Sequence, residues 1–127
     1  MSQRTVAQKL LIRENYRVLL VNKPEGYVQV LGKLPLGVVI VEKPVKGVDL
    51  VQVFLTSKRE LVDCLSKTVP LLAENGLLWV TYPKGSSKIR GDVNRDVIRE
   101  YAQTVGLQAV ALVAIDDVWS ALRLKKT

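Results

Sequence analysis

Histidine is missing from this chain of 127 residues, and cysteine occurs once, as Cys64. Without an imidazole, the chain has no histidine to act as a general base, to activate a serine or cysteine nucleophile, or to bind a metal. One cysteine excludes a disulfide within the chain and leaves too few ligands for a structural zinc site. The sequence therefore predicts no metal centre and is typical of a protein of the reducing cytoplasm.

Long hydrophobic runs are also missing, since none approaches the ~20 residues that a membrane-spanning helix needs. The start of the chain, Met1-Ser2-Gln3-Arg4-Thr5, lacks the basic and then apolar organisation of a signal peptide. We therefore expect a cytoplasmic protein with no membrane contact. Its 19 basic and 12 acidic side chains give a net charge of +7. That surplus predicts weak, non-specific and salt-sensitive attraction to polyanions.

Apolar residues are plentiful, 48% of the total, and they change repeatedly between strand-like runs and helix-like spacing. Strands are expected at 18–21, 38–41, 50–55, 77–82, 109–115 and 118–124. Helices are expected at 7–12, 27–34, 57–73 and 93–105. Ser57 and Glu60 form a capping box for the third helix, and Gly76 is expected to be its left-handed C-cap. The short link Asp116-Asp117 predicts an antiparallel hairpin at the end of the chain.

This order of elements predicts one α/β domain over 1–127, with a short N-terminal lead-in over 1–15. Runs such as Val18-Leu19-Leu20-Val21 suit strands that are covered on both faces, as in parallel sheets. We therefore expect a mostly parallel sheet of about six strands, with helices on both faces and a C-terminal antiparallel hairpin.

Four segments carry a resemblance to known proteins. They are Arg17-Val18-Leu19-Leu20-Val21-Asn22 with Pro24-Glu25-Gly26-Tyr27, Tyr82-Pro83-Lys84-Gly85-Ser86-Ser87, Asn94-Arg95-Asp96, and Trp119-Ser120-Ala121-Leu122-Arg123. Through them the whole chain resembles a family of short bacterial proteins of unknown function. The element order, with residues 8–27 and 74–83, also resembles the fold of S-adenosylmethionine-dependent methyltransferases. These resemblances imply a single Rossmann-like domain and no activity that could be transferred.

The segment that corresponds to the methyltransferase cofactor loop departs from that pattern. Cofactor loops are rich in glycine, so that the backbone can approach the cofactor closely. Here the loop holds one glycine, a rigid proline and a bulky tyrosine; its residues are Asn22, Lys23, Pro24, Glu25, Gly26 and Tyr27. No extra βα unit follows Glu42 either. We interpret the segment as a degenerate cofactor loop and expect no cofactor, S-adenosylmethionine included.

Several other candidate residues have simpler structural explanations. Glu42 lies twenty residues beyond Asn22 at a strand end, the spacing at which an acid binds a cofactor ribose. Because the glycines are missing, we interpret Glu42 as an ordinary solvated residue. Cys64 is expected to be a small buried hydrophobic residue, and Trp119 to fill the core.

A second candidate site follows the fourth expected strand. Ligands of open α/β sheets bind at the carboxyl ends of strands, and a helix that starts nearby adds spare N–H groups and a positive dipole end. The candidate anion-binding residues are Tyr82, Lys84, Gly85, Ser86, Ser87, Lys88, Asn94, Arg95 and Asp96. The alternative is a solvated basic loop in which Asp92 or Asn94 merely caps the helix. The sequence does not decide between the two.

Three functions are compatible with these features. We favour a non-catalytic Rossmann-like module that binds a small anion or a protein partner at the carboxyl edge of its sheet. No set of residues offers an activated nucleophile or an acid–base pair, so no catalytic residue is assigned. The alternatives are an enzyme on a degenerate methyltransferase scaffold and a basic adaptor for nucleic acid or an acidic protein. The sequence leaves the ligand, the partner and the formation of a homodimer open.

Overall fold

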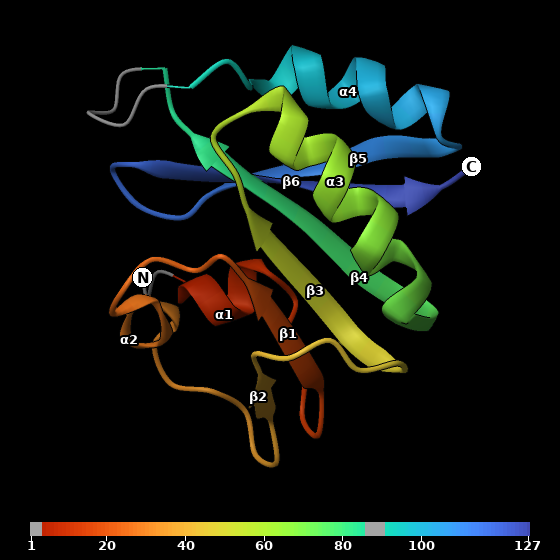
Figure 1. The fold of residues 1–127 in the computed structure, drawn as a ribbon. Helices are drawn as coiled ribbons and strands as arrows, with labels where there is room; N and C mark the ends of the chain where they lie inside the picture. The colour runs from red at the N-terminus through yellow and green to blue at the C-terminus, as the bar shows by residue number, and fades with distance from the viewer. Residues whose placement is uncertain (1–3, 86–90) are drawn as a thin grey trace.

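The computed structural model of the chain describes residues 4–85 and 91–127, which form one α/β domain (Figure 1). Its strands are β1 (Arg17–Val21), β2 (Val39–Val41), β3 (Val48–Phe54), β4 (Leu72–Pro83), β5 (Leu107–Ala114) and β6 (Trp119–Lys126). Its helices are α1 (Val6–Lys9), α2 (Tyr27–Leu31), α3 (Lys58–Thr68) and α4 (Arg95–Thr104), with a 3₁₀ turn, η1, at Val69–Leu71. Among the described residues, no helix has the length and apolar character to cross a membrane.

The described strands make a six-stranded sheet in the order β2-β1-β3-β4-β6-β5. The pairs β1–β2, β1–β3 and β3–β4 are parallel, while β6 runs antiparallel to both β4 and β5. The predicted mixed sheet and C-terminal hairpin are therefore confirmed. After β1 the chain goes to one side to form β2 and then crosses to the other side to form β3. This reversal puts a topological switch point between β1 and β3.

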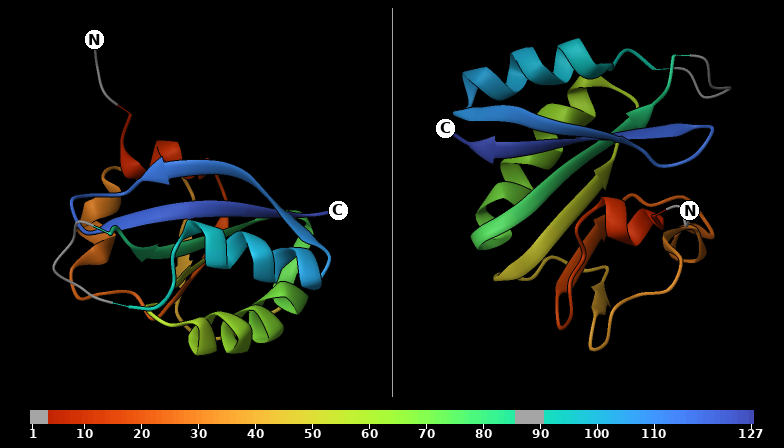
Figure 2. Two further views of the ribbon diagram at one scale, coloured as in Figure 1. Left: turned by 90° about the horizontal axis from the view of Figure 1, so that it is seen from above. Right: turned by 180° about the vertical axis from the view of Figure 1, so that it is seen from behind.

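Helices cover both faces of the sheet, as expected from the apolar runs (Figure 2). On one face, α3 and α4 pack over a core that includes Val51, Val53 and Val80. On the other face, α1 and α2 pack over a second core around Leu20 and Trp79. Because β3 and the second half of β4 are buried on both faces, their sequences lack the alternation of a half-exposed strand.

The boundary between α3 and β4 differs from the prediction. The helix ends at Thr68, and Pro70, which cannot donate a backbone hydrogen bond, lies in η1. Leu72 already belongs to β4, so the expected helix over 57–73 was too long at its end. Gly76 is not a C-cap: Asn75 takes the left-handed φ of 64° instead. A Cβ on Gly76 would lie 2.9 Å from the carbonyl oxygen of Ala73, so this glycine permits a close turn within the strand.

The two N-terminal helices are shorter than predicted. Helix α1 spans only Val6–Lys9, with Thr5 as its N-cap, and α2 ends at Leu31 because Gly32 takes a φ of 82°. Leu34 therefore lies outside the helix that its spacing indicated. The later turns agree with expectation. Asp116 Oδ1 accepts hydrogen bonds from the backbone N–H groups of Val118 (2.8 Å) and Trp119 (2.9 Å), which fixes the predicted hairpin turn.

Candidate functional site

The carboxyl ends of β1, β3 and β4 lie at one edge of the sheet, because the three strands are parallel neighbours. Asn22 follows β1, Thr56 lies just beyond β3, and Lys84 follows β4. The switch point between β1 and β3 opens onto this same edge.

Tyr27, a candidate from the degenerate cofactor loop, is buried within the core beneath this edge. Its hydroxyl donates to Gln52 Oε1 at 2.9 Å, and Gln52 Nε2 donates to Thr81 Oγ1 at 2.9 Å. Gln52 and Thr81 are both 0% exposed, and burial raises the pKa of Tyr27 far above its usual range. The ring also meets Phe54 edge-on, at 4.6 Å between centroids. Tyr27 is therefore buried, and its hydroxyl donates its hydrogen bond inside the protein.

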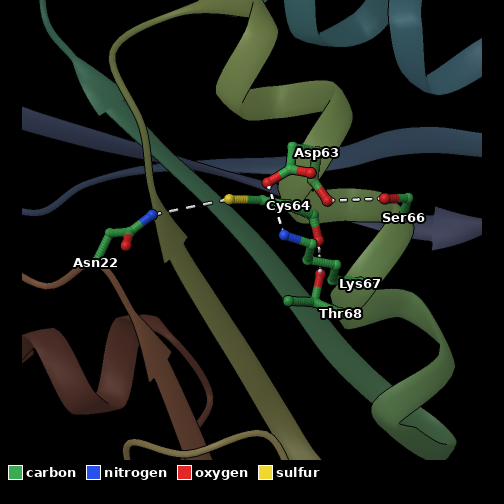
Figure 3. Close-up of polar contacts among 6 residues, drawn as sticks. All are labelled: Asn22, Asp63, Cys64, Ser66, Lys67 and Thr68. Carbon is green, nitrogen blue, oxygen red and sulfur yellow. Dashed lines mark hydrogen bonds and ion pairs between the residues drawn. The ribbon is translucent and has the colours of Figure 1, made fainter.

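The rest of the loop after β1 is also tied to the protein itself. Asn22, at a φ of 60°, points across β3 and donates through Nδ2 to the Cys64 thiol at 3.8 Å (Figure 3). Lys23 Nζ lies 3.0 Å from Glu42 Oε1, an ion pair that joins the loop after β1 to the end of β2. Gly26 takes a φ of 78° as the N-cap of α2. Glu42 thus pairs with Lys23, and more than half of its side chain remains exposed to solvent.

Cys64 lies on α3 with its side chain turned toward the sheet (Figure 3). Burial is the main reason why the pKa of its thiol is raised, and the neighbouring carboxylates of Asp63 and Glu60 raise it further. A thiol held in its protonated form is a poor nucleophile. The prediction of a small buried hydrophobic residue is confirmed.

The N-terminus of α3 is occupied by acceptors of the protein. Ser57 Oγ accepts from the Glu60 N–H at 3.1 Å, and Asp92 Oδ1 accepts from the Lys58 N–H at 2.7 Å. Glu60 Oε1 accepts from the backbone N–H of Thr56 at 3.1 Å and from its hydroxyl at 3.0 Å. The bond from the Thr56 backbone is the largest of the contributions that lower the pKa of Glu60. The predicted capping box is thus half correct. Ser57 Oγ accepts from the Glu60 N–H as the motif predicts, but the Glu60 carboxylate accepts from the Thr56 N–H in place of the Ser57 N–H.

The end of β4 and the start of α4 bring together a third group of candidates. Burial raises the pKa of Tyr82, while Arg95 lowers it and Asp96 raises it, so both charges act on this phenol. Arg95 Nε is 3.8 Å from Asp96 Oδ1, and both side chains are more than half exposed. Asn94 Oδ1 accepts from the Val97 N–H at 2.9 Å, which makes Asn94 the predicted cap of α4.

Lys84 and Gly85 complete the described part of this group. The Lys84 N–H donates to the Val118 carbonyl at 2.8 Å, which holds its backbone against the hairpin turn. Gly85 is exposed, and a Cβ there would meet nothing within 4 Å. The candidates Ser86, Ser87 and Lys88 lie outside the described residues. Among the described residues, no three acidic or cysteine side chains gather closely enough to hold a metal ion.

Two contacts near this edge, made by Gln52 and Asp92, were not predicted from the sequence. Gln52 was read as part of an apolar strand, although a lone amide within such a run is itself a signal of a buried polar contact. Asp92 was considered only as a cap for α4, whereas it caps α3 from 34 residues away. No local pattern indicates such a distant partner.

Several solved structures share this fold, and some of them are named as S-adenosylmethionine-dependent methyltransferases. One from Aquifex aeolicus matches with a TM-score of 0.66 at 12% identity, over 94% of this chain and 86% of its own. The ribosomal protein L11 methylase of Lactobacillus delbrueckii subsp. bulgaricus matches at 0.61 and 10% identity, over 95% and 74%. Fibrillarin from Aeropyrum pernix, in complex with natively bound S-adenosylmethionine, matches at 0.60 and 11%, over 98% and 70%. The fold is therefore Rossmann-like, of the methyltransferase type.

A comparison with curated proteins found no match to this chain. Residues 37–127 match the family described as protein of unknown function (DUF3052), and the chain belongs to this family. The expected resemblance to a family without an assigned activity is thereby confirmed.

Proposed function

We propose that this protein is a non-catalytic Rossmann-like module that binds a small anionic ligand where β4 ends and α4 begins. The proposal rests mainly on the position of Arg95, whose charge acts on the buried phenol of Tyr82 at the carboxyl edge of the sheet. Lys84 adds a second cation to the same edge. Ligands of open α/β folds bind at the carboxyl edge of the sheet, which is where β4 ends.

The neighbouring segments support this location by elimination. The donors at the start of α3 are bonded to Ser57 and Asp92, and Lys23 is paired with Glu42. Arg95, by contrast, makes a single ion pair within the described residues, the long contact to Asp96, and more than half of its side chain is exposed to solvent. An incoming phosphate or carboxylate would replace that weak contact with a charge-assisted hydrogen bond.

The chemistry of the described edge argues for binding without catalysis. Burial raises the pKa of Tyr82, so its phenol is not poised to act as a base at neutral pH. The Cys64 thiol likewise has a raised pKa and lies against Asn22. Neither group meets the requirement that a catalytic residue have a pKa matched to its task.

We predict that changing Lys84 and Arg95 together to alanine removes the stabilisation that phosphate and sulfate give to the protein. An anion at concentration L that binds only the folded state stabilises it by RT ln(1 + L/Kd), and this stabilisation is lost with the site. Melting temperatures are measured in sulfate, in phosphate and in chloride at equal ionic strength. Without anion, the double variant should lie within about 0.5 kcal/mol of the parent protein, since both changes are at the surface.

The matched control is Lys46→Ala with Lys67→Ala, which removes the same charge elsewhere. Lys46 is exposed in the turn before β3, and Lys67 pairs with Asp63 at 3.1 Å in the last turn of α3. This control should keep the full anion effect. If the Lys84 and Arg95 variant gains as much stability from sulfate as the control does, the proposed site is wrong.

We also predict that the protein does not bind S-adenosylmethionine at physiological concentrations. Tyr27 is held in the core by Gln52, and the Lys23–Glu42 ion pair closes the loop where a cofactor would approach. Isothermal titration should give no binding heat, with the Aeropyrum pernix fibrillarin, a protein known with this cofactor bound, as the positive control. A dissociation constant in the micromolar range would contradict this prediction.

A further inference from the structure

A cavity of about 560 Å³ lies at the opposite end of β4 from the proposed anion site. It forms because the sheet divides there. Strand β6 pairs with β4 only from Leu78↔Leu124 to Pro83↔Trp119, whereas Lys125 and Lys126 pair with β5. The first part of β4 remains on β3, through Leu72↔Val48 and Leu77↔Leu50. Figure 1 shows β4 and β6 diverging toward the right of the view, where β4 begins and β6 ends.

The lining of this cavity combines apolar walls with a surplus of positive charge. Leu72, Leu77, Leu107 and Leu124 supply apolar surface, and the cationic side chains are Arg123, Lys125 and Lys126. Glu74 is the acidic side chain among the lining residues. A cavity of this size lies within the range of small-molecule sites, about 300–1,000 Å³. Its charge favours an anion, and its walls favour an apolar body.

Arg123, one of the lining residues, carries a buried donor of a charged group. Its Nε is buried, and this N–H has no hydrogen-bond partner among the described residues. A buried donor of a charged group is costly when left unpaired, so such donors normally have a partner. Arg123 lies on β6 in register with Trp79 on β4 and Ala111 on β5, neither of which offers a side-chain acceptor. A guanidinium in this position is suited to a carboxylate or phosphate group, which can accept two of its hydrogens.

One wall of the cavity is an irregular part of β4. Asn75, at its left-handed φ of 64°, and Gly76 lie there, between the pairs Leu72↔Val48 and Leu77↔Leu50. A Cβ on Gly76 would lie 2.9 Å from both the Ala73 carbonyl oxygen and a Leu72 methyl group. The glycine is thus required for a turn that forms part of the cavity wall.

We propose that this cavity binds a small amphipathic anion, a carboxylate or phosphate ester with a hydrocarbon or aromatic body. The anionic group pairs with Arg123, and the body lies against Leu77, which is on the same face of the sheet as Arg123. This second site is independent of the proposed anion site, since β4 separates the two along its length.

The test uses octanoate as the carboxylate probe and phenyl phosphate as the phosphate probe, each titrated into the full chain labelled for amide NMR. Acetate and inorganic phosphate serve as probes without an apolar body. Octanoate or phenyl phosphate should shift the amides of residues 72–78 and 123–126 and saturate at millimolar concentrations, and the two bare anions should bind more weakly there. The stronger of the two large probes identifies the anionic group.

Three variants separate this site from the other. Arg123→Gln should weaken binding about 10-fold or more, as expected when a hydrogen bond to a charged group is lost. Leu77→Trp should block the cavity while keeping Arg123, so it should abolish probe binding. This variant tests the proposal even if Arg123→Gln does not fold. The Lys84→Ala and Arg95→Ala double variant should bind the probes like the parent protein, and Arg123→Gln should keep the stabilisation by sulfate.

The proposal is overturned if neither large probe shifts the amides of residues 72–78 and 123–126. It is equally overturned if the folded Leu77→Trp variant binds with unchanged affinity. Loss of this binding in the Lys84 and Arg95 variant would show that the probes occupy the other end of β4. That result would also overturn the proposal.

Discussion

Replacing Gly91 by alanine is expected to destabilise the protein by about 3 kcal/mol, through a backbone clash and the loss of a helix cap. A Cβ on Gly91 would overlap the backbone carbonyl of Thr56, and this carbonyl also accepts the Asp92 N–H at 3.0 Å. Backbone atoms cannot rotate away as the end of a flexible side chain can. The segment would have to move, and Asp92 would lose its 2.7 Å contact with the Lys58 N–H.

The free energy of unfolding by urea measures this effect, with Gly85→Ala as the control. Gly85 is exposed, and a Cβ there would contact nothing within 4 Å, so its replacement should be nearly neutral. Equal stability of the two variants would mean that the segment before α4 does not press against the β3–α3 turn. Glycine at position 91 is thus expected to let the segment before α4 pack against the turn between β3 and α3.

The second large effect is expected for Gln52→Leu, which should cost about 3 kcal/mol although the two side chains are similar in volume. The change leaves the hydroxyls of Tyr27 and Thr81 without the partners that they have at 2.9 Å each. Each buried and unsatisfied polar group costs about 1–3 kcal/mol. Urea unfolding again provides the measurement.

The control for this prediction removes all three polar groups at once. The triple variant Tyr27→Phe, Gln52→Leu and Thr81→Val has no unpaired group left, so it should recover much of the lost stability. If it is less stable than Gln52→Leu alone, the loss comes from packing and the hydrogen-bond chain is not the cause.

The central strands and the hairpin were predictable because their sequences contain only one pattern. Runs such as Val18-Leu19-Leu20-Val21 are buried on both faces, and Asp116 makes its turn with its own neighbours. The junction of α3 and β4 failed for the opposite reason. Leu72 continues the helical spacing of Leu61 and Leu65, yet the Pro70 turn diverts it into a strand. Periodicity identifies an apolar face but does not reveal where the chain leaves it.

The candidate sites likewise contain some features that local sequence predicts and others that it does not. Tyr82, Asn94 and Arg95 could be placed near one another, because strand ends and helix starts are local features of the sequence. The contacts of Asn22 with Cys64 and of Tyr27 with Gln52 join residues that are 42 and 25 positions apart. Such contacts depend on the order of strands in the sheet, which the sequence pattern limits without determining.

The chain of hydrogen bonds through Tyr27, Gln52 and Thr81 has a consequence for thermodynamic linkage. In a protein whose ligand completes the core, occupancy and folding are coupled, and the empty form is the less stable one by the free energy of binding. Here the chain supplies both the donors and the acceptors beneath the carboxyl ends of β1, β3 and β4. The hydrogen bonds of this interior are therefore made by the chain alone, and a ligand bound at the proposed site would add to stability by mass action without supplying any of them.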